Sequence, residues 1–181
     1  MLAKGNALSS NQSKVTKIIA DDYPQKILAG LGVLFSRFIK ILPNFSLVGS
    51  FGFFQSNLVL FFAQIVVFDL FFGGVYTGFY FTYLGFFGYW LLGRLAGNKI
   101  KRQVLMLPLA SFLFFFISNL GVWWFWYERT LSGLMTCYVL ALPFYRNTLL
   151  GDLFFGGIFI MIKMLARSMR LNKQHSYANS Q

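Results

Sequence analysis

Cysteine and histidine are almost absent from this 181-residue chain, which has one of each, Cys137 and His175. A disulfide within the chain is therefore excluded, and so is a zinc site built from the cysteines and histidines of one chain. Acidic residues are also scarce, five against sixteen lysines and arginines. Few carboxylates remain to bind a metal, and the sequence predicts neither a metal centre nor a cofactor.

The common enzyme signatures are missing as well. No G-x-x-x-x-G-K-[ST] phosphate loop occurs, so the chain cannot by itself be the ATPase of a pump, and neither H-E-x-x-H nor G-x-S-x-G is present. The nearest approach is the pair Asp69 and Asp152, similar to the aspartates of intramembrane aspartyl proteases. Those proteases carry the motif G-x-G-D, whereas in this chain Leu149 occupies the position of the first glycine. In addition, the two carboxylates of such an enzyme must lie adjacent to each other to share a proton. We expect no enzyme, with an aspartyl enzyme as an alternative.

Charge is scarce too, because only 12% of the residues are charged. A soluble domain normally has about a quarter of its residues charged. Instead, 57% of the chain is hydrophobic and 20% aromatic, in long apolar runs broken by short polar joints, which indicates several membrane spans. We predict one membrane domain over residues 26–167, between a polar tail at 1–25 and a basic polar tail at 168–181.

The apolar runs predict an all-α fold, a polytopic bundle of about six transmembrane helices. In residues 131–142 the large apolar residues recur at helical spacing opposite small ones, which predicts an extra helix lying on the outer surface. Pro143 would end this helix, and Asn147 or Thr148 would cap the last span. The second run is a short or tilted helix. The six runs are 26–41, 47–54, 58–72, 79–95, 104–127 and 149–166.

Lysines and arginines cluster in the N-terminal tail, in the joint 94–102 and near residues 163–173. Six spans with both ends inside place all three clusters on the cytoplasmic side, as the positive-inside rule requires. The clusters flank apolar runs and form no soluble basic patch, so we predict contact with the lipid bilayer and no nucleic-acid binding. Arg37 and Lys40 are exceptions near the outer end of the first run. Either they line an outer site, or the first helix is re-entrant.

Charged residues within spans are costly and usually have a partner or a function, which singles out Asp69, Arg146 and Asp152. Asp69 could form a structural ion pair with Arg146 or Arg37. Asp152, in the first turn of its predicted helix, could simply favour the positive end of the helix dipole. The other interpretation is contact with a ligand or coupling to an ion.

Aromatic residues gather on two helix faces. Asn119, Trp123 and Trp126 share one face of the fifth run beneath Glu128, which is typical either of a stacking wall in a small-molecule pocket or of interfacial tryptophans. In the fourth run a tyrosine face could line a pocket, and a face of small residues predicts close helix packing. The tyrosines are Tyr76, Tyr80 and Tyr83, and the small residues are Gly78, Thr82 and Gly85.

Three stretches, PNFSLVG at 43–49, SNLGVW at 118–123 and the segment 137–152 ending in ALPFYRNTLLGD, resemble an uncharacterised bacterial family of small polytopic membrane proteins described as candidate transport proteins. The resemblance covers about 27–162. More distantly, the layout is similar to the S-components of energy-coupling factor (ECF) transporters.

The second resemblance implies six helices in the bacterial inner membrane, both termini cytoplasmic, and a substrate site near the outer face. S-components often dock on their coupling protein through two alanines four residues apart, but here Ala29 is followed by Val33. Together with Asp69 and Asp152, the substrate-binding residues implied are Asn44, Tyr76, Asn119, Trp123, Glu128, Arg146 and Asn147.

The function that we expect is capture of a small organic solute, of the vitamin or precursor class, from the outer side. The energy would come from a separate ATPase or coupling module, or from ion coupling through Asp69 or Asp152. The alternative is a non-catalytic accessory or assembly subunit of a larger membrane complex, and the second alternative is the aspartyl enzyme.

Overall fold

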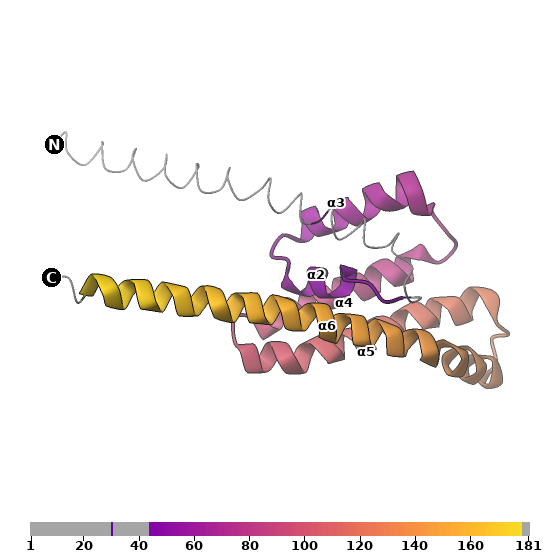
Figure 1. The fold of residues 1–181 in the computed structure, drawn as a ribbon. Coiled ribbons are helices and arrows are strands. Elements are labelled where there is room, and N and C mark those ends of the chain that lie inside the picture. Colours follow the sequence, from indigo (N-terminus) through magenta and orange to yellow (C-terminus); the bar gives the residue numbers. More distant parts are fainter. Residues whose placement is uncertain (1–29, 31–43, 179–181) are drawn as a thin grey trace, which may run out of the picture.

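A computed structural model describes residue 30 and residues 44–178, and this part of the chain is helical without strands (Figure 1). The predicted all-α class is confirmed. The first apolar run, with Arg37 and Lys40, lies outside the described residues except for Gly30. The elements are α2 (Val48–Phe54), α3 (Leu58–Phe68), the π-helix η2 (Asp69–Gly73), α4 (Phe79–Ala96), α5 (Ile100–Trp126) and α6 (Leu131–Ala178).

Helix α2 is short and lies inside the bundle. It has seven residues, all buried except Phe54, and it contacts α4, α5 and α6. At about 1.5 Å per residue it is only about 10 Å long, far less than a bilayer core of about 30 Å. The predicted short helix is confirmed. Because α2 is too short to cross a bilayer by itself, the structure does not confirm six full spans.

Helix α3 begins at a side-chain cap and ends in a wider turn. Asn57 Oδ1 accepts a hydrogen bond from the Leu60 N–H at 3.0 Å, which satisfies a free donor at the helix start. The last turn, η2, is a π-helix closed by Gly74, whose φ of 70° suits glycine. The end of this helical stretch at Gly73 agrees with the predicted end of the third apolar run at residue 72.

Helices α4 and α5 form an antiparallel pair, joined by a short turn at Gly97. The small residues of α4 face α5: a Cβ added at Gly85 would lie 2.7 Å from the Phe114 ring, and one at Gly78 would lie 2.8 Å from the Phe125 ring. The close packing predicted for this small-residue face is therefore confirmed at both glycines.

Helix α6 corrects one prediction. It runs without interruption from Leu131 to Ala178 and includes Pro143. The separate surface helix over 131–142 is wrong, and neither Asn147 nor Thr148 caps a new helix. Thr148 Oγ1 instead donates to the Phe144 carbonyl oxygen one turn earlier, at 3.0 Å.

Contacts with α5 on both sides of Pro143 explain this continuity. Before the proline, the Tyr138 hydroxyl donates to the Phe116 carbonyl oxygen at 2.7 Å. After it, the Tyr145 ring packs on the Phe115 ring with centroids 4.6 Å apart. Because one partner helix holds both halves, the missing proline N–H does not end α6.

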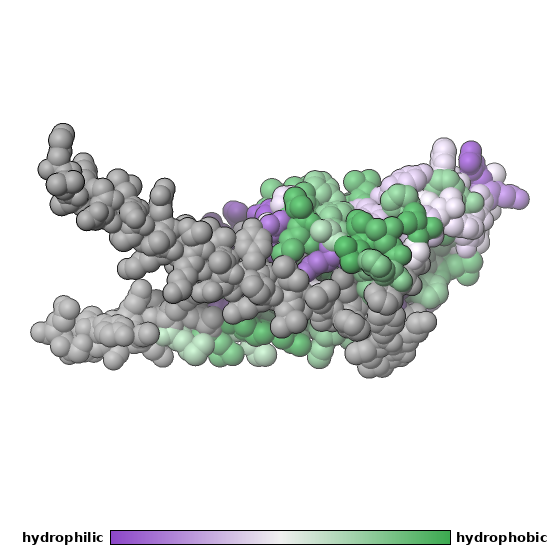
Figure 2. All heavy atoms as spheres, turned by 90° about the horizontal axis from the view of Figure 1, so that it is seen from above, coloured by the Kyte–Doolittle hydropathy of each residue, from purple (hydrophilic) through white to green (hydrophobic). Residues whose placement is uncertain are grey.

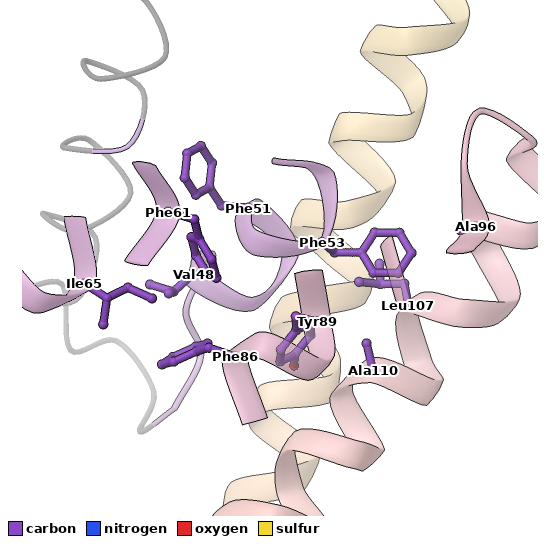
Figure 3. Close-up of a cluster of buried hydrophobic side chains, with 10 residues drawn as sticks. All are labelled: Val48, Phe51, Phe53, Phe61, Ile65, Phe86, Tyr89, Ala96, Leu107 and Ala110. Atoms are coloured by element: carbon purple, nitrogen blue, oxygen red, sulfur yellow. The ribbon is translucent and has the colours of Figure 1, made fainter. Parts of the chain in front are cut away.

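A cluster of buried apolar residues joins α2 to α3, α4 and α5 (Figure 3). The rings of Phe51 and Phe61 and those of Phe61 and Phe86 lie about 6 Å apart, a usual distance for aromatic pairs. The cluster consists of Val48, Phe51, Phe53, Phe61, Ile65, Phe86, Tyr89, Ala96, Leu107 and Ala110.

The outer surface is largely apolar. Among the described residues, two helical segments are long and apolar enough to cross a membrane, Ile100–Trp126 and Leu131–Leu165. Only 28% and 17% of their most apolar stretches are buried, unlike the core helix of a soluble protein. Figure 2 shows apolar residues over the middle of the visible described surface and polar residues gathered towards one end.

Candidate functional site: two aspartates in different surroundings

Asp152 lies in the interior of α6, not at its start. The helix begins at Leu131, so Asp152 is several turns away from the positive end of the dipole. The interpretation of Asp152 as a first-turn residue is therefore wrong, since the dipole acts mainly on the first turn. The side chain is only 1% exposed and needs partners in the protein interior.

Two hydroxyl groups from other helices supply those partners. Ser50 Oγ of α2 lies 3.1 Å from both Asp152 Oδ1 and the Asp152 carbonyl oxygen. The Tyr89 hydroxyl of α4 donates to Oδ2, and Tyr89 is also 1% exposed. Both side-chain donors to the carboxyl are thus neutral.

Ser111 of α5 completes the surroundings of Asp152. It is fully buried, and its side chain lies beside the Asp152 carboxyl and the Tyr89 hydroxyl. Its Oγ has no hydrogen-bond partner within the part of the chain that the structure describes. The Asp152 cluster, formed by Ser50, Tyr89, Ser111 and Asp152, therefore joins α2, α4, α5 and α6.

Glycines allow α2 and α6 to approach at this cluster. A Cβ added at Gly49 would lie 2.7 Å from Asp152 Oδ1 and 2.6 Å from Tyr89 Cζ. One added at Gly151 would lie 3.2 Å from the Ser46 backbone nitrogen. The contacts place the sequence stretches 43–49 and 141–152 side by side.

Asp69 has more open surroundings. It lies at the start of η2, half-buried, and its Oδ2 accepts a hydrogen bond from the Tyr83 hydroxyl of α4 at 2.8 Å. The carboxylate borders a cavity of about 310 Å³ with otherwise largely apolar walls. The lining residues are Phe62, Val66, Asp69, Leu70, Gly74, Val75, Phe79 and Tyr83.

The two carboxylates are bound by different tyrosines. Tyr83 and Tyr89 are six residues apart on α4, which corresponds to about 9 Å along the helix axis. Each carboxylate therefore has its own tyrosine donor on α4. Arg146 is exposed on α6, and within residues 44–178 no ion pair joins it to Asp69.

The other predicted residues on α5 and its following loop form local contacts. The Asn119 amide donates to the Phe115 carbonyl oxygen of its own helix at 2.8 Å. Trp123 Nε1 donates to the Glu128 carbonyl oxygen at 3.0 Å, so these two residues are brought together. Trp126 is exposed. None of these contacts joins the residues to either aspartate.

Three further predicted residues also lie apart from both aspartates. Asn44 is exposed with a positive φ of 62°. The exposed Tyr76 donates from its hydroxyl to Thr82 Oγ1 at 2.5 Å and does not line the cavity. Asn147 is half-buried within α6. The nine predicted site residues therefore do not converge on one place.

Ser50, Tyr89 and Ser111 were missed by the sequence reasoning. Each is a polar or hydroxyl-bearing residue within an apolar run, directly after a small residue. Lone hydroxyls next to small residues often mark close helix contacts in membrane proteins. That signal could have selected these three positions but not their common partner.

Residues 24–174 match the sequence model of a family described as a family of unknown function, DUF6580. The match includes both aspartates and all three members of the Asp152 cluster on the other helices. No curated protein and no solved structure matches the chain.

Proposed function

We propose a function for this chain, which belongs to the DUF6580 family: it is a membrane transport protein that captures a small organic solute from the outer side. The single observation that carries this proposal is the cavity beside Asp69, with apolar walls and one carboxylate. We infer a solute of the vitamin or precursor class, with energy from a separate coupling module or from an ion.

The composition and charge of the two longest helices support the membrane placement. Basic residues precede or begin α5, and Lys163 lies near the end of the apolar part of α6. Trp124 and Trp126 are exposed at the other end of α5, where interfacial aromatics are expected. This distribution supports our proposal that the joint at 97–102 and the C-terminal end face the cytoplasm, in a bacterial inner membrane.

The cavity has the size and chemistry of a small-molecule site. Its volume of about 310 Å³ falls at the lower end of the range of roughly 300 to 1,000 Å³ for ligand pockets. Phe62 and Phe79 provide rings on which a flat solute can stack. The Asp69 carboxylate, oriented by the Tyr83 hydroxyl, would bind a basic or hydrogen-bond-donating group. A compact solute with an aromatic body and one such group fits best.

A second candidate function is that of an accessory or assembly subunit. The exposed apolar residues along α5 and α6 favour it, because the same surface suits lipid tails or the helices of a larger membrane complex. The aspartyl enzyme gains no support, since Asp69 and Asp152 bind separate tyrosines.

Thermal unfolding of the purified full-length protein with a panel of vitamins and their precursors tests the proposal. A compound that binds only the folded state raises the apparent Tm. Val66 lines the cavity, whereas the neighbouring exposed Val67 does not, which makes Val66→Trp and Val67→Trp a matched pair.

We expect the Tm shift to be lost in Val66→Trp, where the new ring fills the cavity, and kept in Val67→Trp. Asp69→Asn should weaken binding of basic compounds more than that of neutral ones. If no compound shifts the Tm, and the chain copurifies in fixed ratio with a larger membrane complex, the accessory role replaces transport.

A further inference from the structure

We propose that Asp152 binds and releases a proton, and that proton binding is coupled to the docking of α2 against α6. The proposal uses the Asp152 cluster and none of the residues that line the Asp69 cavity. It therefore goes beyond solute capture and can be tested without a known solute.

The closed surroundings of Asp152 favour its neutral form. The side chain is 1% exposed, and no cation faces it within the described residues. Its partners, the hydroxyls of Ser50 and Tyr89, are neutral. An ionised carboxylate without a counter-charge is costly in such an interior, and a bound proton removes that cost.

Among the described residues, the groups around Asp152 are few, and none carries a positive charge. Tyr89 of α4 and Tyr145 of its own helix are the titratable groups that face it. Helices α2 and α5 contribute only Ser50 and Ser111. The proton that enters the site therefore resides on the carboxyl of Asp152.

Ser111 can pair with the carboxyl in either form. Its Oγ is fully buried and lies beside the Asp152 carboxyl. A hydroxyl can accept a hydrogen bond from a neutral carboxyl or donate one to an ionised carboxylate. The preference for the neutral form therefore comes from the burial of Asp152 and from the absence of a facing cation among the described residues.

Helix α2 is the element whose docking closes the site. It brings Ser50 and Gly49 onto Asp152, and it has only seven residues between two non-helical segments. A helix of this length is not stable alone and depends on its packing. When α2 moves away, water reaches the carboxyl, which then releases its proton to water as the ionised form.

Linkage fixes the direction of the effect. Because the docked state favours the protonated carboxyl and the open state the ionised one, proton binding stabilises docking. Raising the pH therefore favours opening of α2, by up to about tenfold in the opening equilibrium per pH unit for one proton. Once the pH is high enough for the Asp152 carboxyl to be ionised in both the docked and the open state, the opening equilibrium no longer depends on pH.

Hydrogen exchange of the α2 backbone amides over a pH series measures this equilibrium in the full-length protein in lipid nanodiscs. After correction for the intrinsic exchange rate, we expect protection of residues 48–54 to fall as the pH rises. Asp152→Asn keeps the shape of the side chain but cannot ionise, so its protection should not depend on pH. Asp69→Asn is the matched control and should behave as the wild type.

Two results would overturn the proposal: protection of α2 that is independent of pH in the wild type, or an unchanged pH dependence in Asp152→Asn. If Asp152→Asn does not fold, Ser111→Ala replaces it. That variant removes a hydroxyl that can donate to the ionised carboxylate, so the pH at which the opening of α2 levels off should move to a higher value. An unmoved profile in a folded Ser111→Ala variant also contradicts the proposal.

Discussion

The two aspartates share a type of partner but differ in how they are enclosed. Each accepts a hydrogen bond from a tyrosine of α4, Asp152 from Tyr89 and Asp69 from Tyr83. Groups from four helices bury Asp152, which is 1% exposed, whereas Asp69 borders a cavity. Enclosure, more than the immediate partner, therefore distinguishes a carboxyl suited to hold a proton from one suited to bind a solute.

The largest effect is expected where α2 and α4 touch through their backbones. A Cβ added at Gly93 would lie 1.8 Å from the Phe53 carbonyl oxygen of α2, and a backbone atom cannot move aside as a side chain can. We expect Gly93→Ala to destabilise the fold by about 3 kcal/mol or more, as strong overpacking does. The apparent Tm in detergent measures the change, and a Tm equal to that of the wild type would contradict this packing.

The next largest effect compares the two aspartates directly. Asp152→Ala leaves the buried hydroxyls of Ser50 and Tyr89 without their acceptor, which should cost about 2 to 3 kcal/mol. Asp69→Ala should cost less than about 1 kcal/mol, because water can enter the cavity and replace the carboxylate. Chemical denaturation of both variants tests this order, and equal losses would mean that enclosure does not distinguish the sites.

A smaller effect separates the two tyrosines. Tyr89→Phe removes a buried donor and should cost about 1 kcal/mol, while Tyr83→Phe at the cavity should cost about half of that or less. Tyr83→Phe should instead weaken solute binding in the thermal assay, because the Asp69 carboxylate loses the group that orients it. A larger stability loss for Tyr83→Phe than for Tyr89→Phe would reverse the comparison.

The smallest effect has the opposite sign. A Cβ added at Gly157 of α6 would meet no atom within 4 Å. Since alanine restricts the unfolded chain and favours the helix, Gly157→Ala should stabilise the protein by about 0.5 kcal/mol. It serves as the control for Gly93→Ala, and a destabilised Gly157→Ala variant would show that this face of α6 is covered.

Local signals in the sequence predicted much of the helix order. The apolar runs 58–72, 79–95 and 104–127 depend only on neighbouring residues, and α3 with η2, α4 and α5 agree with them to within a few residues. Pro143 was misread because its local effect is to break a helix. Contacts with α5, more than twenty residues away in sequence, overrule it.

The candidate site was harder to predict because its contacts are distant in sequence. Asp152 was selected from its charge alone, but its acceptor role for Ser50 joins residues 102 positions apart. The spacing within either segment holds no information on that pairing. Nor did the sequence indicate that Asp69 and Asn119 have separate surroundings, because both were placed only by their depth along a helix.

The unbroken α6 has a consequence for the lipid around it. Its apolar part, Leu131–Leu165, has 35 residues and extends about 50 Å, whereas the hydrocarbon core of a bilayer is about 30 Å thick. In a bilayer such a helix must lean or leave its first turns at headgroup level. Because Tyr138 ties those turns to α5, both helices lean together. In a bilayer, the acyl-chain length of the lipids would therefore set the tilt of the pair.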